Sequence, residues 1–100
     1  MTYLRILLVS ISCLASYLYA QSPIANFTAN PLTVCVGQNV NFTNTSSANG
    51  GLALSSYQWD FGDGNAATTT NAAHAFSTAG TFTITLVATN ANGVADAEIK

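Results

Sequence analysis

The stretch that most constrains the fold is residues 57–64, where three aromatic side chains alternate with polar ones ahead of two glycines. A period of two places Tyr57, Trp59 and Phe61 on one face of a β-strand. The Gly-Asp-Gly at residues 62–64 predicts a tight turn, because glycine accepts positive φ and aspartate accepts hydrogen bonds from nearby backbone N–H groups. We therefore expect a core strand of an all-β domain.

The same alternation recurs along the chain from residue 24 onward, with Gly, Asn and Ser between the segments. The expected strands span residues 24–29, 39–43, 57–61, 81–89 and 94–100, with an extended piece at 33–36 and one or two edge strands near 68–70 and 75–76. Short strands at roughly 8–12-residue spacing favour a β-sandwich. The predicted core residues are Phe27, Val40, Phe42, Tyr57, Trp59, Phe61, Phe76, Phe82, Ile84 and Leu86.

Several motifs resemble those of one family. Residues 59–64, with the sequence Trp-Asp-Phe-Gly-Asp-Gly, resemble the signature of the PKD (polycystic kidney disease) domain, and residues 36–46, 74–76, 79–86 and 89–93 resemble its other motifs. The resemblance implies an immunoglobulin-like antiparallel β-sandwich of about seven strands. It leaves open whether the final strand is truncated at Lys100 and the chain is part of a longer protein. The residues that it assigns to the structural motif are Trp59, Asp60, Phe61, Gly62, Asp63, Gly64, His74 and Gly80.

Residues 1–20 have the layout of a secretory signal peptide, with Arg5 near the start, an apolar run over residues 6–14 and small Ala20 before the expected cleavage site. We expect export, a mature domain at residues 21–100, and contact with a membrane only through the leader before its removal. One alternative is an uncleaved anchor, but the apolar run is shorter than the ~20 residues of a spanning helix. Another is lipidation of Cys13.

The composition excludes some functions. Only 6% of the residues are charged, and the two basic ones are Arg5 and Lys100, so no basic patch exists to bind nucleic acid. After removal of the leader, Cys35 is the only cysteine. We expect it to be buried, since a free cysteine beside two valines behaves as a small apolar residue. A disulfide to another chain is the alternative.

Three polar side chains are candidates for chemistry. Asp60 and Asp63 are weak candidates for Ca²⁺, but their spacing departs from the known calcium loop. We expect them to cap their own turn instead. His74 is the only histidine, and with no nucleophile motif in the chain we expect it to bond a loop carbonyl or carboxylate. The sequence therefore predicts no catalytic residue, no metal site and no cofactor.

The predicted function is that of a non-enzymatic extracellular module. The PKD resemblance implies contacts with an extracellular protein or polysaccharide at the cell surface, in a larger adhesive or secreted protein. The alternatives are a carbohydrate-binding accessory module of a secreted hydrolase, in which Tyr57 or Trp59 stacks on sugar rings, and a mechanical spacer. No ligand-binding residue is assigned, because the matched motifs build the fold.

Overall fold

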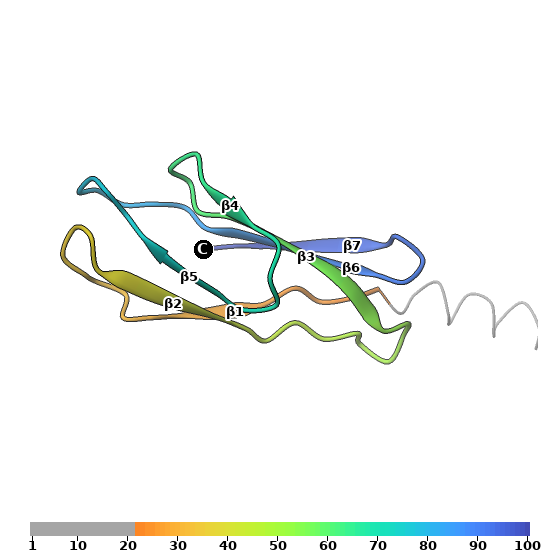
Figure 1. Ribbon diagram of the computed structural model, residues 1–100. Coiled ribbons are helices and arrows are strands. Elements are labelled where there is room, and N and C mark those ends of the chain that lie inside the picture. The colour runs from red at the N-terminus through yellow and green to blue at the C-terminus, as the bar shows by residue number, and fades with distance from the viewer. Residues whose placement is uncertain (1–21) are drawn as a thin grey trace, which may run out of the picture.

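The computed structural model describes residues 22–100, which form two packed antiparallel sheets (Figure 1). The strands within these residues are β1 (Phe27–Asn30), β2 (Asn39–Asn44), β3 (Leu54–Asp60), β4 (Ala66–Ala67), β5 (Ala72–Ala75), β6 (Thr85–Asn90) and β7 (Ala95–Ile99). One sheet has the order β1-β2-β5 and the other the order β4-β3-β6-β7. The expected all-β sandwich of about seven strands is confirmed.

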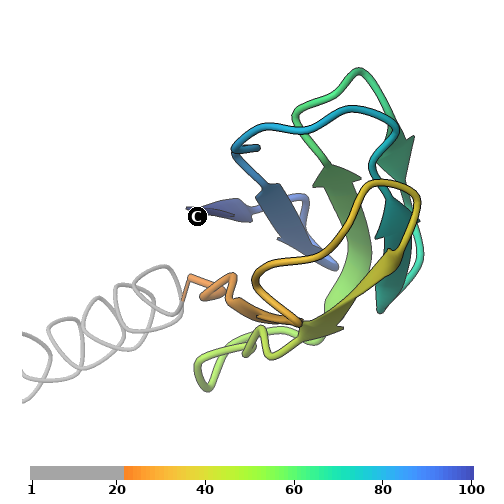
Figure 2. The ribbon, with the colours of Figure 1, turned by 90° about the vertical axis from the view of Figure 1, so that its left-hand side faces the viewer.

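The register of each pair turns the large side chains toward the space between the layers. In the four-stranded sheet Trp59 pairs with Leu86, and both are completely or almost completely buried. In the three-stranded sheet Phe27 and Phe42 lie on β1 and β2 and are equally buried. Figure 2 shows the two layers from the side.

One continuous cluster fills the core between the sheets. Eight of the ten predicted core residues belong to it and are buried, namely Phe27, Val40, Phe42, Trp59, Phe61, Phe76, Ile84 and Leu86. Tyr57 and Phe82 are only partly buried, although both pack against the cluster. Two small residues that we did not predict, Ala25 and Ala88, are also buried.

Strand boundaries differ from the predictions where a backbone partner is missing. In place of the strand expected at residues 81–89 the structure has β6 at Thr85–Asn90. Ile84, just before β6, pairs through two hydrogen bonds with the backbone of Lys100. The opening strand begins at Phe27 instead of residue 24, since Ile24 makes an isolated bridge to Ser47. The two edge strands exist but are displaced from the expected positions, to β4 and β5.

The prediction that Cys35 is buried is wrong. Cys35 is exposed, because the chain leaves the three-stranded sheet after β1 and turns at its edge. The carbonyl of Cys35 accepts a hydrogen bond from the N–H of Gln38 (3.1 Å), which closes this turn. The preceding Val34 faces the core instead, as alternate residues of an extended segment face opposite sides.

The expected leader at residues 1–20 lies outside the described residues, so its cleavage stays a prediction. Within residues 22–100 no helix is long and apolar enough to cross a membrane.

We predict that Leu86→Ala lowers the free energy of unfolding by about 3 kcal/mol, because it removes a completely buried side chain and leaves a cavity beside Trp59. Urea unfolding followed by tryptophan fluorescence measures the loss. The control is Ile99→Ala, at a side chain that is 61% exposed, with an expected loss of about 0.5 kcal/mol. Equal losses in the two variants would contradict this account of the core.

Candidate functional site

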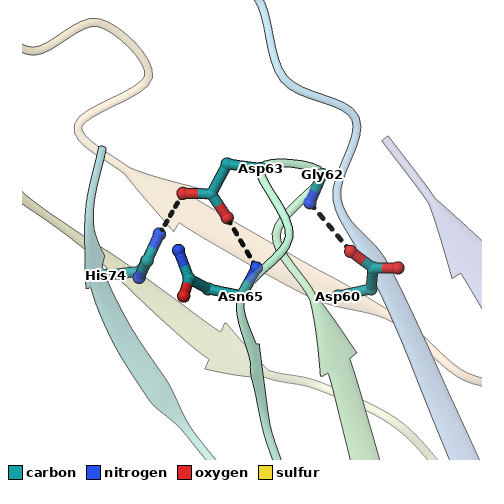
Figure 3. Close-up of polar contacts among 5 residues, drawn as sticks. All are labelled: Asp60, Gly62, Asp63, Asn65 and His74. Atoms are coloured by element: carbon teal, nitrogen blue, oxygen red, sulfur yellow. Dashed lines mark hydrogen bonds and ion pairs between the residues drawn. The ribbon is translucent and has the colours of Figure 1, made fainter. Parts of the chain in front are cut away.

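The turn after β3 is held by the two aspartates of the signature (Figure 3). A carboxylate oxygen of Asp60 accepts a hydrogen bond from the N–H of Gly62 (2.9 Å), and Oδ1 of Asp63 accepts one from the N–H of Asn65 (3.0 Å). The N–H of Phe61 donates to the carbonyl of Asn65 (3.1 Å) and closes the loop. The expected capping bonds of both aspartates are present.

Asp63 also connects the two sheets. Its second carboxylate oxygen lies 2.7 Å from Nε2 of His74, which is on β5 in the opposite sheet (Figure 3). The His74 ring stacks on Phe61, with centroids 4.3 Å apart and planes 7° apart, and its edge meets Phe76. The side chains of His74 and Asp63 are only 16% and 13% exposed. Of the two partners expected for His74, a loop carbonyl or a carboxylate, the structure therefore has the carboxylate.

The hydrogen bond from His74 is the main cause that holds the pKa of Asp63 below its ordinary value of 3.8. Partial removal of the carboxylate from water opposes this effect, and the hydrogen bonds from Asn65 reinforce the lowering. Asp63 is consequently an ionised hydrogen-bond acceptor at neutral pH, and both of its oxygens are engaged.

Three of the other residues of the predicted structural motif lie in or beside this turn. Trp59 is 1% exposed, and its Nε1–H donates to the carbonyl of Thr69 (2.9 Å). Gly62 has φ +76°, and a Cβ there would lie 2.5 Å from the carbonyl oxygen of Thr83. Gly64 also has positive φ, but it faces open space. Gly80 lies apart from the turn, on the exposed segment before β6.

The arrangement at the turn favours a structural role over metal binding. Each weak calcium candidate already accepts a backbone hydrogen bond within its own turn, and Asp63 accepts a second bond from His74. In the part of the chain that the structure describes, no group of three or more His, Cys, Asp or Glu side chains is placed to hold a metal ion. Calcium prefers six to eight oxygen ligands, which these two carboxylates do not supply.

Sequence reasoning missed three polar residues that hold the sandwich together. Asn90 is buried, and its Oδ1 accepts hydrogen bonds from Asn92 and Val94, both at 3.0 Å, across the β6–β7 turn. Asp96 accepts a hydrogen bond from the N–H of Ala25 (2.8 Å), and the amine of Lys100 donates to the carbonyl of Phe27. The Asn-x-Asn-Gly spacing signals an aspartate-like cap at Asn90. No local pattern reveals the other two contacts, because each joins residues more than 70 positions apart.

These features define a β-sandwich module organised around a Trp-Asp-Phe-Gly-Asp-Gly turn, and the comparison with known proteins agrees. The chain matches the family model of the PKD domain over residues 20–100. It therefore belongs to the PKD domain family.

One relative is a much longer protein than this chain. Collagenase ColA of Clostridium perfringens is 32% identical over 68 residues, which are 68% of this chain and 6% of that protein. The chain thus spans a small fraction of the length of this relative.

Solved structures support the same fold. A structure described for the promiscuous specificity of carbohydrate-binding modules from the β-sandwich superfamily has a TM-score of 0.75 at 29% identity, covering 80% of this chain and 33% of that one. The PKD1 domain of Vibrio anguillarum Epp has a TM-score of 0.70 at 29% identity, covering 80% and 89%. The PKD1 domain of Vibrio cholerae metalloprotease PrtV has a TM-score of 0.68 at 30% identity, covering 79% and 91%.

We predict that Gly62→Ala destabilises the domain more than Gly64→Ala. Both substitutions place a side chain at positive φ, at a cost of about 1 kcal/mol. Only the new Cβ at Gly62 meets the backbone of Thr83, and this overpacking adds about 2 kcal/mol. Urea unfolding of both variants tests the difference. Identical losses would show that the close approach of the turn to Thr83 is unimportant.

A second prediction concerns pH. Because the pKa of folded Asp63 is depressed, Asp63 stabilises the fold fully above the unfolded pKa of about 3.9, and this contribution is lost as the pH falls through the folded pKa. In His74→Phe, which keeps a ring on Phe61 but has no donor, the pKa of Asp63 should rise toward 3.8. NMR titration of the Asp63 carboxyl carbon measures it. His74→Gln, which retains an N–H donor, is the control, and an unchanged pKa in His74→Phe would contradict the assigned cause.

Proposed function

We propose that this chain is an exported, non-enzymatic accessory module that contacts extracellular protein. The observation that carries the proposal is that the polar residues of the signature form hydrogen bonds inside the domain. Asp60 and Asp63 cap the turn, and His74 donates a hydrogen bond to Asp63 across the sandwich. The hydrogen bonds of these side chains are made to the domain itself. Similarity to PKD1 domains, one of them from a metalloprotease, and to part of a collagenase supports an accessory role.

Export and removal of residues 1–20 are part of this proposal. They rest on the charge and hydropathy pattern of the leader and on the small residue at Ala20. The domain that remains would begin at Gln21 and act at the cell surface or in the medium.

Contact with a polysaccharide is the second candidate, and the similarity to a structure described for carbohydrate-binding modules favours it. The distribution of aromatic rings favours protein instead. The large apolar side chains that are exposed within residues 22–100 are all aliphatic, namely Ile24, Leu32, Val36, Leu52, Val94 and Ile99. Tyr57 and Phe82 are the aromatic residues there that are only partly buried, so few ring faces are open to stack on a sugar.

A retention experiment tests the proposal. The protein is expressed with its leader, recovered from the medium, and its intact mass is compared with that of residues 21–100. It is then incubated with collagen fibrils, cellulose and chitin, and the bound fraction is measured. We expect the mass of the cleaved chain and greater retention on the protein fibre than on either polysaccharide.

The control variant is Tyr57→Leu, which removes the half-buried ring but keeps an apolar side chain. Retention on cellulose or chitin that Tyr57→Leu abolishes, in a variant that still unfolds cooperatively, would favour the carbohydrate-binding module. Retention on none of the three polymers would contradict the proposal and favour a spacer. Full-length mass with residues 1–20 still attached would contradict cleavage.

A further inference from the structure

The tripeptide Ala-Asn-Gly occurs in two turns at the same end of the sandwich, at residues 48–50 and 91–93 (Figure 1). A hydrogen bond from the N–H of Ala91 to the carbonyl of Ala53 (3.1 Å) joins the two connections. Asparagine is chemically labile, and a following glycine has no side chain to hinder attack of its backbone nitrogen on the asparagine side chain. The local sequence is the same in both turns, so a difference in their reactivity would come from the fold.

The first turn leaves the reacting groups open. Asn49 and Gly50 are both exposed, and both have positive φ, of 55° and 77°. The N–H of Gly51 donates to the carbonyl of Ala48 (3.0 Å) across them, which makes them the central pair of a tight turn of the type that Asn-Gly favours. Among the described residues, the N–H of Gly50 has no hydrogen-bond acceptor. The nitrogen that would attack Asn49 is therefore not engaged.

The second turn engages the equivalent groups. The N–H of Gly93 donates to the carbonyl of Asn90 (3.0 Å). The buried side chain of Asn90 accepts from the N–H groups of Asn92 and Val94. Attack by the Gly93 nitrogen requires this turn to open and to lose these hydrogen bonds, each of which stabilises the closed form. Asn92 is exposed like Asn49, so exposure alone does not distinguish the two turns.

The loop that carries the first turn is anchored on both sides of its tip. Ser47 and Ile24 exchange two backbone hydrogen bonds, both of 2.8 Å, and Ala53 accepts the hydrogen bond from Ala91. Between these anchors, one backbone hydrogen bond closes the turn, and the hydroxyl of Ser47 accepts from the N–H of Asn49 (3.0 Å). The tip can consequently rotate while the rest of the sandwich stays folded.

We propose that Asn49 is a site of spontaneous covalent modification, in which the backbone nitrogen of Gly50 attacks Cγ of Asn49. The nitrogen gives its proton to water, and the new N–Cγ bond forms as the C–N bond of the side-chain amide breaks. The amide nitrogen takes up a proton and leaves as ammonia, and a cyclic imide remains. Water then opens the imide at either carbonyl and yields aspartate or isoaspartate at position 49. The reaction needs water alone as co-reactant and transfers no electrons.

The modification changes both the charge and the backbone of this loop. Residues 44–55 contain no charged side chain, and the new carboxylate adds one negative charge to the formal net charge of −2. Isoaspartate also routes the chain through the former side chain, which inserts a methylene group into the backbone and disrupts the tight turn. The inference does not depend on the proposed function.

The identical tripeptides provide the test within one molecule. The purified folded protein is incubated at mildly alkaline pH, and peptide mapping by mass spectrometry measures conversion to aspartate and isoaspartate at both sites. We expect Asn49 to react at least about tenfold faster than Asn92, because the second turn must first lose several hydrogen bonds. In concentrated urea the two rates should become similar, since both sites then lie in an unfolded chain.

A variant of the second turn tests the assigned cause. Asn90→Ala removes the side-chain oxygen that accepts from Asn92 and Val94. The rate at Asn92 should rise by about fivefold or more in this variant, while the rate at Asn49 stays as in the wild type. Gly51→Ala is the control beside the first turn, because it leaves the reacting pair unchanged and should not alter either rate. Urea unfolding checks that both variants fold.

Equal rates at Asn49 and Asn92 in the folded protein, or a faster reaction at Asn92, would overturn the inference. A difference that persists in urea would also contradict it, because the cause would then lie outside the folded turns. If neither site reacts in the folded protein over a time in which the unfolded chain does, the first turn protects Asn49 and the inference is wrong.

Discussion

The contact of one indole ring with two phenyl rings across the sandwich is the interaction on which the rest of this domain depends. Trp59 of β3 packs against Phe27 and Phe42 of the opposite sheet, with ring centroids 5.3 and 5.8 Å away. Its N–H finds a partner in the carbonyl of Thr69, so the ring is buried without an unpaired donor. In a domain this small, a few large rings supply much of the burial that offsets chain entropy.

The signature turn extends this packing to the end of the sandwich. Phe61 follows Trp59 on the same face and stacks on the His74 ring. Asp63 then accepts a hydrogen bond from His74. Asp63 and His74, residue types that often act in catalysis, thus join the turn before β4 to the opposite sheet. This explains how a motif with two carboxylates and a nearby imidazole serves the fold of a PKD domain.

Local patterns predicted much of this architecture, and long-range pairing accounts for what they missed. Alternation identified the core face that carries Trp59, and turn chemistry identified the caps of Asp63, because both depend on adjacent residues. The strand expected from residue 81 was too long, since pairing requires a neighbour that periodicity does not show. Burial of Cys35 failed for a related reason: its apolar neighbours indicated an interior position, but the chain had already left the sheet. The hydrogen bonds that Asp96 and Lys100 make to the first segment of the fold had no signal in the local sequence.

Those two hydrogen bonds bear on how the domain would respond to a pulling force. Residues 25 and 27 near the start of the fold are held by side chains of residues 96 and 100 near its end, and the two segments run in the same direction. A force that separates residues 22 and 100 would slide these segments past each other, so both contacts would be loaded together and not opened one after the other. Shear of this kind resists extension more strongly than peeling does. The first and last described segments are therefore joined by contacts that such a force would load in shear.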